Sequence, residues 1–362
     1  MSDMPLVSIV IPAFNHESFV AQALDSTLES GLERVEVLVC DDASTDATPD
    51  IIQEWACRHE GRISRFLFIE HDENTGIATA LNELIAESRG DIIHGLASDD
   101  YYLPGGLLAK TKALLASPGW AGAFCDGKAV SFEGSVLHES LMAVSSIDAA
   151  KLDSTDMAKE LLFNWGAPAN LISWRRSAFK IHGGEYEFDA NVFCEDLDFA
   201  WWAMSREAFG YIPEICCAYR LRSWPHASNV NPVVELRDVA HVLAKYAPAL
   251  PPQLADSMRS LALSNFYRAA HDVERADVHM RRFQGEIVRG REVEAAQAAQ
   301  EAVCASAEAS AALALDTEAR AREAEPQLAA VAGSASWRVT GPLRWLKNAG
   351  AKVAGQPRGR RY

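Results

Sequence analysis

The chain has 362 residues, of which 49% are hydrophobic and 23% charged, and its formal net charge is −16. These values are ordinary for a globular protein, and the acidic balance argues against a general nucleic-acid-binding protein, which would carry a basic footprint. The length allows one large α/β domain with an appendage, or two domains. No stretch reaches the ~18 apolar residues of a membrane span, and no basic segment precedes the first apolar run, so we expect a cytoplasmic protein.

Four apolar runs alternate with helical patterns in the first hundred residues. A run at 6–11 ends at Pro12, and runs follow at 35–40, 65–71 and 91–97. The segments between the runs carry apolar residues at helical spacing. Alternating strands and helices are typical of a parallel sheet with right-handed crossovers. We therefore predict an α/β, Rossmann-like, mainly parallel sheet flanked by helices.

Polar residues follow each run at the point where the predicted strand ends. They are Pro12 to Asn15, Asp41 and Asp42, Asn74 and Gly76, and Asp99 and Asp100. Ligands of such sheets bind at the carboxyl ends of the strands, so we expect these residues to converge on one edge. Neither a G-x-G-x-x-G sequence nor a P-loop is present to cradle phosphates.

The Asp99-Asp100 pair has two interpretations. Carboxylate oxygens suit hard cations such as Mg2+ and Mn2+, which often bridge to substrate phosphates. The diphosphate of a nucleotide ligand would lack the usual glycine-rich loop here. A metal held by Asp99 and Asp100 could supply the positive charge that it needs. The alternative is a solvated Asp-Asp turn.

The cysteines predict neither a disulfide framework nor a zinc site. No C-x-x-C pair occurs, and the number of cysteines is odd. Cys40 ends an apolar run and is expected to be a small buried hydrophobic residue. The full set is Cys40, Cys57, Cys125, Cys194, Cys216, Cys217 and Cys304.

Several blocks occur in order and at similar spacing to a known family. VSIVIPAFNHESFVAQALDSTL, VEVLVCDDASTDAT, NTGIATALNELIAESRGD and LASDDYYLPGGL, within about residues 6–225, resemble the family-2 inverting glycosyltransferases of the GT-A fold. The resemblance implies that the loop after the first strand frames the base and ribose of a nucleotide-sugar, and that Asp42 accepts hydrogen bonds from the base, with Asp41 as a neighbouring candidate. The nucleotide-sugar-binding set that it implies is Pro12, Ala13, Phe14, Asn15, Asp41, Asp42, Asn74, Gly76, Asp99 and Arg222.

The same resemblance places the family's metal motif on Ser98, Asp99 and Asp100. Many relatives carry a further Asp where this chain has Ala97. The metal, Mn2+ or Mg2+, is therefore expected mainly on Asp100, with Asp99 as a second ligand that faces the ribose or sugar.

Glu195 and Asp196 form the second candidate chemical site. An inverting transfer needs a carboxylate to take the proton of the acceptor hydroxyl. The resemblance places this motif at the head of a helix with Asp196 as the base and Glu195 as the second candidate. The alternative is a pair of acids that stabilises a helix N-terminus through the dipole. Relatives often carry an Arg on this helix, for which Arg206 is a candidate substitute.

Two further segments are assigned from the resemblance. Tyr219 to Arg222 is similar to the family's Tyr-Arg-x-His segment, with Arg222 at the His position and His226 as a candidate replacement. A cation here would contact the diphosphate. Trp165 and Trp174 would either stack on a sugar or lie in the core.

The C-terminal third changes character. We expect a GT-A catalytic domain over 1–228, a helical subdomain over 229–285, a long Ala/Glu-rich helix or weak coiled coil over 286–326, and a basic, Trp-containing tail over 327–362. Segment 334–347 resembles a terminal motif of bacterial surface-polysaccharide glycosyltransferases. It would contact the inner membrane peripherally, contact a partner enzyme, or dock on its own protein.

The function predicted from the sequence is that of an inverting glycosyltransferase. It would move a sugar from a UDP-, dTDP- or GDP-linked donor to a glycan or lipid-linked glycan, such as lipopolysaccharide, in surface polysaccharide synthesis. The alternatives are a non-catalytic nucleotide- or glycan-binding scaffold and a metal-dependent nucleotidyltransferase. The sequence leaves the donor sugar and homo-oligomer formation open.

Overall fold

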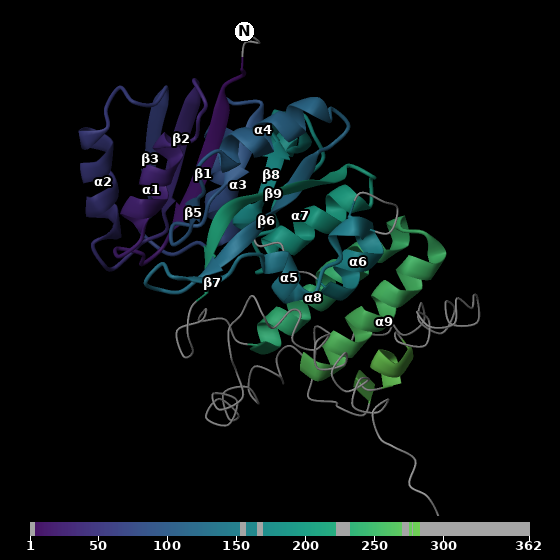
Figure 1. Ribbon diagram of the computed structural model, residues 1–362. Coiled ribbons are helices and arrows are strands. Elements are labelled where there is room, and N and C mark those ends of the chain that lie inside the picture. The colour runs from purple at the N-terminus through teal and green to yellow at the C-terminus, as the bar shows by residue number, and fades with distance from the viewer. Residues whose placement is uncertain are drawn as a thin grey trace, which may run out of the picture.

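The chain enters its sheet through strand β1 after a short N-terminal segment (Figure 1). The structure is a computed structural model that describes residues 4–152, 157–164, 169–221, 232–269, 275–276 and 278–282. The expected long helix at 286–326, the tail at 327–362 with its segment 334–347, and the residues Trp165, Arg222 and His226 lie outside the described residues.

The first half of the sheet is parallel, as the alternation of apolar runs and helical patterns predicts. Its strands lie side by side in the order β3-β2-β1-β4, and all three neighbouring pairs are parallel. Short helices make the crossovers between them. The strands are β1 (Val7–Ala13), β2 (Val35–Asp41), β3 (Arg65–Glu70) and β4 (Ile92–Gly95), and the helices are α1 (Val20–Leu28), α2 (Thr48–Arg58) and α3 (Ile77–Glu87).

Beyond β4 the sheet is mixed. The order continues β4-β8-β6-β9-β5, in which only β6 and β9 pair in parallel, and β7 pairs with the outer part of β6. The strands of this half are β5 (Tyr101–Tyr102), β6 (Gly122–Val130), β7 (Val136–His138), β8 (Ile172–Arg175) and β9 (Phe209–Arg220). Its helices are α4 (Gly106–Ala116), α5 (Leu141–Ser145), α6 (Met157–Asn164) and α7 (Glu195–Met204). Short 3-10 helices cover Ala149–Lys151, Ala169–Leu171, Arg176–Ala178, Lys180–His182 and Ala247–Ala249.

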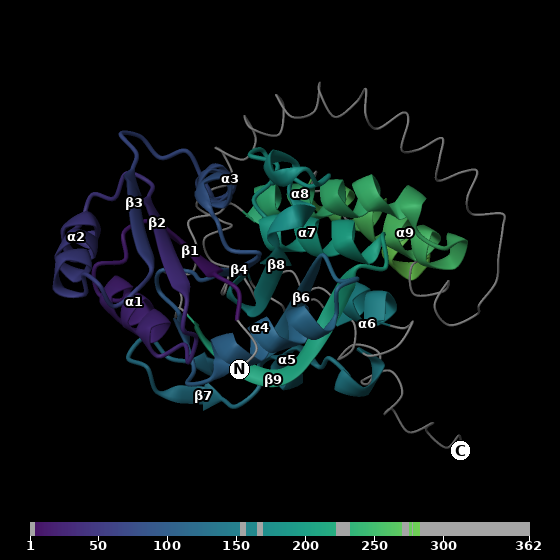
Figure 2. The same cartoon turned by 90° about the horizontal axis from the view of Figure 1, so that it is seen from above.

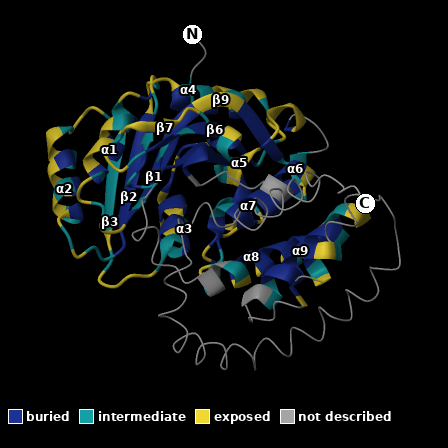
Figure 3. Cartoon of the chain, turned by 60° about the horizontal axis from the view of Figure 1, so that its bottom comes forward, coloured by how far each residue is buried: buried dark blue, intermediate teal, exposed yellow. Residues whose placement is uncertain are grey.

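Each face of the sheet has its own apolar core, because successive side chains of a strand point to opposite faces. Ile9 and Ile11 of β1 pack with α1, α2 and α4 on one face. Val10 of β1 and Leu38 of β2 pack with α3 and α7 on the other. Figure 2 shows α1 and α2 on one side of β1–β3 and α3 on the other. The outer surfaces of α1 and α2 are exposed, whereas β1 and β2 are buried and β3 is of intermediate exposure (Figure 3).

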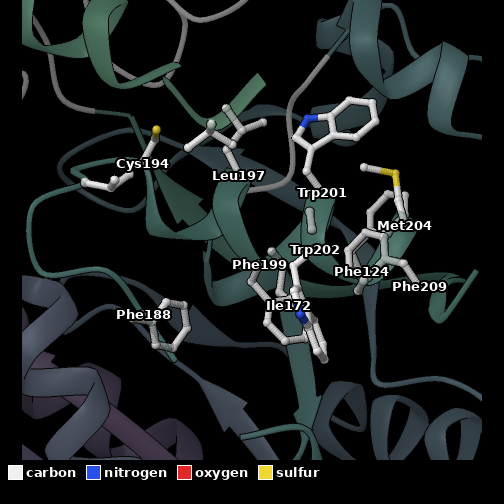
Figure 4. Packing of buried hydrophobic residues seen from close by; sticks show 14 of the residues in the cluster. Phe124, Ile172, Phe188, Cys194, Leu197, Phe199, Trp201, Trp202, Met204 and Phe209 are labelled. Carbon is white, nitrogen blue, oxygen red and sulfur yellow. The ribbon is translucent and has the colours of Figure 1, made fainter. Parts of the chain in front are cut away.

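Helix α7 is buried along almost its whole length in the core that also contains α3. Phe199, Trp201 and Ala203 are fully buried in it, and Figure 4 shows its side chains among Phe124, Ile172 and Phe209 of the sheet. Trp174 of β8 is also fully buried and contacts the rings of Phe188 and Phe199. Trp174 is therefore a core residue rather than a sugar platform.

Helices α8 (Pro232–Tyr246) and α9 (Pro252–Ala269) continue this core. The carboxylate of Asp198 on α7 is buried, and it accepts a hydrogen bond of 2.8 Å from Lys245 Nζ on α8. The backbone N–H of Phe193 donates to Asp238 of α8. The boundary expected near 228 falls among residues that are not described, so the division into domains stays a prediction. Among the described residues, none of the helices combines the length and apolar content that a bilayer crossing requires.

Candidate active site

The expected polar residues all follow strands at one edge of the sheet. Because β3, β2, β1 and β4 are parallel, the loops after them share the carboxyl edge. The head of α7 lies toward the same edge, for a topological reason. The chain leaves α7 at the amino edge, where Ala121 N, just before β6, donates to Ala208 O, just before β9. Helix α7 therefore runs from the carboxyl edge to the amino edge and begins at Glu195.

The loops after β1 and β2 interlock. Asn15 has a left-handed backbone conformation with φ of 54°. Its N–H donates to Ser44 Oγ at 2.8 Å, and its side-chain Oδ1 accepts from Thr45 N at 2.8 Å. Pro12 is half-buried, Ala13 is buried, and Phe14 is 40% exposed. The expected base-framing residues thus belong to a hydrogen-bonded pair of loops on which Phe14 is an exposed aromatic residue.

Asp41 and Asp42 are both buried, and both organise backbone. Asp41 caps its own loop by accepting from Ser44 N at 2.9 Å and Ser44 Oγ at 2.6 Å. Asp42 reaches the loop after β3, where it accepts from Thr75 N and Gly76 N, each at 2.8 Å. Burial alone would raise the pKa of Asp42, but hydrogen bonds from Thr75, His71 and Gly76 outweigh it and lower that pKa.

Asn74 and Gly76 complete this loop. The Asn74 side chain is exposed and donates to the Asp42 carbonyl at 3.1 Å. Gly76 has φ of 89° and ψ of 156°, a region that is essentially closed to other residues. The glycine is required because this backbone conformation directs its N–H at Asp42.

The Asp99-Asp100 pair lies in a turn directly after β4, closed by a hydrogen bond from Asp100 N to Ala97 O at 3.0 Å. His16 joins this turn to the loop after β1, with Nδ1 2.7 Å from Ser98 Oγ and Nε2 3.8 Å from Asp99 Oδ2. The Asp99 carboxylate is 13% exposed, and Asp100 is 2% exposed. The alternative interpretation, a solvated turn, does not fit, because both carboxylates are largely buried.

Arg220, the last residue of β9, holds the turn from the other side. Its backbone N–H donates to Asp100 Oδ1 at 2.6 Å, and its Nε donates to the Asp99 carbonyl at 2.8 Å. The guanidinium also donates to Phe132 O at 2.8 Å and lies over the ring of Phe19. Arg220 is therefore a buried clamp on the acidic turn.

The donor set of this turn fits a hard divalent cation. Two adjacent carboxylates stand at the sheet edge. The Arg220 guanidinium, which would compete with a cation, is directed to backbone carbonyls and to the side-chain oxygen of Gln22. Oxygen ligands of this kind suit Mg2+ and Mn2+. Asp99 and Asp100 are the residues that would hold such an ion.

Glu195 and Asp196 occupy the first turn of α7, as predicted, with Cys194 at the N-cap position. Burial raises the pKa of Asp196 to about 6. Burial, and then the charge of Asp196, raise the pKa of Glu195 well above its ordinary value. Asp196 is the more exposed of the two, and its Oδ1 accepts from Leu197 N at 2.6 Å. A partly exposed carboxyl group with a raised pKa is suited to proton transfer.

Arg206 is not placed to substitute for a catalytic Arg. It follows the end of α7, on the amino side of the sheet, and its guanidinium pairs with Glu185 at 3.1 Å. Sequence reasoning also missed His16 and His71, which tie the loops together. His16 lies in the loop after β1, and His71 directly follows β3. A histidine close after a predicted strand was the available signal.

Comparisons with known proteins identify a similar family and a similar fold. The family model described as "Glycosyl transferase family 2" matches residues 8–161. Chondroitin synthase of Escherichia coli is 40% identical over 101 residues, which are 28% of this chain and 14% of that protein. The chain thus spans about one seventh of the length of this curated relative.

Solved structures share the fold. The crystal structure of S. aureus TarS 1-349 in complex with UDP-GlcNAc is 16% identical, has a TM-score of 0.53, and covers 77% of this chain and 92% of its own. The mannosyltransferase PcManGT from Pyrobaculum calidifontis in complex with GDP-Man and Mn2+ is 19% identical, has a TM-score of 0.53, and covers 91% and 87%. The GT-A-type sheet flanked by helices is therefore the fold of this chain.

Proposed function

Because residues 8–161 belong to glycosyl transferase family 2, we propose that this chain transfers a sugar from a nucleotide-diphosphate sugar to a glycan by single displacement with inversion. The observation that carries the proposal is the joint placement of Asp99, Asp100 and Asp196 toward the carboxyl edge of one sheet. Asp99 and Asp100 would act on the donor, and Asp196 would act on the acceptor hydroxyl.

The donor binds across the interlocked loops. Phe14 provides an exposed ring beside the base, and Asp41, Asp42, Asn74 and Gly76 form the wall of the nucleoside pocket. Asp42 already accepts four hydrogen bonds from the protein, at 2.8–2.9 Å from Thr75, Gly76 and His71. Asp42 therefore contributes to base recognition in two ways. It holds the 71–76 loop in place, and it presents its carboxylate oxygens to the base.

Asp99 and Asp100 would hold Mn2+ or Mg2+, which would supply positive charge for the departing diphosphate. Asp100 is buried and oriented by the backbone of Arg220, so it is the firmer ligand. Asp99, whose side chain is more exposed, faces the ribose or sugar. A structure of PcManGT contains Mn2+ together with GDP-Man, which supports a metal-dependent donor site.

Asp196 is the general base. It takes the proton of the acceptor hydroxyl as the oxygen attacks the anomeric carbon, and the bond from that carbon to the diphosphate breaks. The raised pKa makes Asp196 a stronger base than an ordinary aspartate, and the group is largely ionised at neutral pH. Glu195 is the more buried neighbour and remains the second candidate.

The acceptor is a glycan or lipid-linked glycan of a surface polysaccharide. The names of relatives such as chondroitin synthase support a polysaccharide product. Segment 334–347, outside the described residues, brings the enzyme to the cytoplasmic side of the inner membrane. Co-flotation of the full chain with anionic vesicles tests this, beside a variant with Trp337 and Trp345 changed to Ser; equal flotation would exclude the segment as the anchor.

A donor panel tests the proposed function. UDP-, GDP- and dTDP-sugars are added with Mn2+ or with a chelator, and thermal shift reports binding while released nucleoside diphosphate reports turnover. We expect one nucleotide class to raise Tm and to release nucleoside diphosphate only with metal. Binding without release would support a scaffold, and pyrophosphate release from sugar phosphate and nucleoside triphosphate would support a nucleotidyltransferase.

A further inference from the structure

The imidazole of His71 lies between two carboxylates that come from different elements. His71 directly follows β3, Asp42 directly follows β2, and Glu83 lies on α3. His71 Nδ1 is 2.8 Å from Asp42 Oδ1, and His71 Nε2 is 2.9 Å from Glu83 Oε2. The ring is largely buried, with 11% of its side-chain surface exposed. A single side chain thus joins the end of β2 to α3.

Both contacts require a hydrogen on the ring. An ionised carboxylate only accepts hydrogen bonds, so each ring nitrogen has to donate. The Thr75 hydroxyl is consistent with a hydrogen on Nδ1, because it donates to Asp42 Oδ1 at 2.9 Å and its own oxygen lies 3.1 Å from Nδ1 as an acceptor. A neutral imidazole carries one N–H and could satisfy only one of the two acids. The arrangement therefore fits the doubly protonated imidazolium.

The charges that face His71 favour this imidazolium. Hydrogen bonds to Asp42 and then to Glu83 raise the pKa of His71, against the effect of burial. Cys40 lies beside the ring and adds no charge at neutral pH, because burial raises the pKa of its thiol to about 12. The other acids near the ring are Asp41, which accepts from Ser44, Glu70, which accepts from Gln53, and the exposed Asp72 and Glu73. Asp42 and Glu83 are thus the two acids that contact the ring.

The imidazolium holds Asp42 in place for its other contacts. Asp42 accepts from the backbone N–H groups of Thr75 and Gly76, each at 2.8 Å, and so holds the loop that forms a wall of the nucleoside pocket. A neutral ring would donate to one acid only, so either Asp42 would lose a charge-assisted hydrogen bond or the link to α3 would break.

We propose that His71 is a positioning residue of the donor site, which as an imidazolium holds Asp42 and the 71–76 loop in the arrangement that receives the nucleoside. This inference rests on the proposed function, because it requires a nucleotide to bind at this loop.

The consequence is a dependence of nucleotide affinity on pH. Because the pKa of His71 is raised in the folded protein, the contribution of the imidazolium is complete below the ordinary histidine pKa of about 6.5 and is lost as pH rises through the folded pKa. Nucleotide affinity should therefore fall above the folded pKa. Linkage is reciprocal, so a nucleotide that prefers the imidazolium should itself raise the pKa of His71.

The charge of His71 can be measured without any nucleotide. Full-length protein with 15N-labelled histidine side chains is titrated by NMR, and the His71 signal is the one that His71→Gln lacks. We expect a midpoint above about 6.5. Glu83→Gln should lower this midpoint, because a neutral carboxamide replaces a charge. Glu87→Gln is the matched control on α3, since Glu87 pairs with Arg65 and should leave the midpoint unchanged.

Calorimetric titration with UDP, GDP and dTDP at several pH values tests the positioning role. We expect the nucleotide that binds to lose about three- to tenfold in affinity above the His71 midpoint, and to raise that midpoint by about 0.5 to 1 pH unit. Asp196 titrates near pH 6 as well, so the loss is assigned to His71 by its move to lower pH in Glu83→Gln. His71→Gln should bind more weakly and lack this loss.

The inference is overturned if the His71 midpoint is not raised, if Glu83→Gln leaves the midpoint unchanged, or if a nucleotide binds equally well on both sides of it. Because the Glu83 side chain is 47% exposed, Glu83→Gln maintains the test in the case that His71→Gln does not fold. Failure of the proposed function has a different signature. None of the three nucleotides would then bind to wild type at any pH, even with His71 titrating as expected, and the donor-site role of His71 would fall with it.

Discussion

The backbone N–H of Arg220 donates to Asp100 Oδ1 at 2.6 Å, while the Arg220 side chain donates to the Asp99 carbonyl at 2.8 Å. One residue at the end of β9 thus orients both acids of the turn after β4. The two residues are 120 positions apart in the sequence. The acidic turn is therefore built by tertiary structure rather than by its own sequence alone.

Arg220→Lys should weaken the metal site. Lysine keeps the charge but cannot reproduce the fan of hydrogen bonds to Asp99, Ser131 and Phe132. We expect the apparent affinity for Mn2+ to fall about tenfold, or about 1.4 kcal/mol, measured as Mn2+-dependent nucleoside diphosphate release. Arg206→Lys is the matched control, because Arg206 also lies over an aromatic ring, Trp202, but on the amino side of the sheet. Equal losses in both variants would remove the special role of Arg220.

The pH dependence of turnover should report Asp196. Because a base must be ionised, kcat/KM should rise with pH through about 6, the pKa of Asp196. Asp196→Asn should lower kcat by about 10²–10⁴-fold and remove this limb of the profile. Glu195→Gln is the companion variant. If Glu195→Gln removes the limb and Asp196→Asn does not, Glu195 is the base.

The substitution Asp196→Asn should also stabilise the fold. A carboxyl group whose pKa is higher in the folded protein is more stable there when protonated, so its contribution is lost as pH rises from about 4 to about 6. Asparagine avoids this loss. At pH 7 we expect Asp196→Asn to raise the free energy of unfolding by roughly 1–3 kcal/mol, measured by urea denaturation. Near pH 3, where the aspartate is protonated in both states, the difference should vanish.

Gly76→Ala should strain the loop that Asp42 holds. Its φ of 89° is unfavourable for alanine, although a Cβ atom would meet nothing within 4 Å. We expect a stability loss of about 1–3 kcal/mol together with weaker donor binding. Gly61→Ala is the control, since Gly61 also has a positive φ of 79° and an open surrounding. It should lose stability but keep donor affinity by titration calorimetry; a donor-affinity loss shared by both would contradict a local effect.

The pair of Lys245 and Asp198 should anchor α8 to the catalytic core. Asp198 is 1% exposed as a side chain, so Lys245→Met leaves a buried carboxylate without its cationic partner, although the Tyr186 hydroxyl still donates to it. We expect a loss of about 2 kcal/mol in the free energy of unfolding. Lys180→Met breaks the exposed pair with Glu187 and should cost at most about 0.5 kcal/mol. If Lys245→Met and Lys180→Met lower the unfolding temperature by similar amounts, the buried pair stabilises the fold no more than the exposed pair does.

The sequence predicted the parallel half of the fold because its signal is local. Apolar runs, the Pro12 break and the polar loop at Asp41 and Asp42 each occur within a few residues. The strands after β4 were harder to predict. Strand β5 has two residues, Tyr101–Tyr102, and exists because it pairs with β9. Its antiparallel register depends on a partner that comes more than a hundred residues later.

The site divides in the same manner. The strand-end residues were predictable, whereas the contacts that orient them were not. His16 contacts Ser98 across 82 positions, and Cys40 approaches His71 across 31. Neither spacing matches a motif, so Cys40 was predicted to be only a small buried residue. The burial of Cys40 is confirmed. Its closeness to His71 could not be predicted from the sequence and is seen only in the folded structure.

The central claim is that the acidic turn and the head of α7 perform separate steps of one transfer. The direct measurement is nucleoside diphosphate release, with donor affinity measured in parallel, for wild type, Asp100→Ala and Asp196→Asn. We predict that Asp100→Ala loses metal-dependent donor binding and release, and that Asp196→Asn keeps donor affinity but loses release by about 10²-fold or more. Full turnover in Asp196→Asn, or undiminished release by wild type in a chelator, would contradict the account.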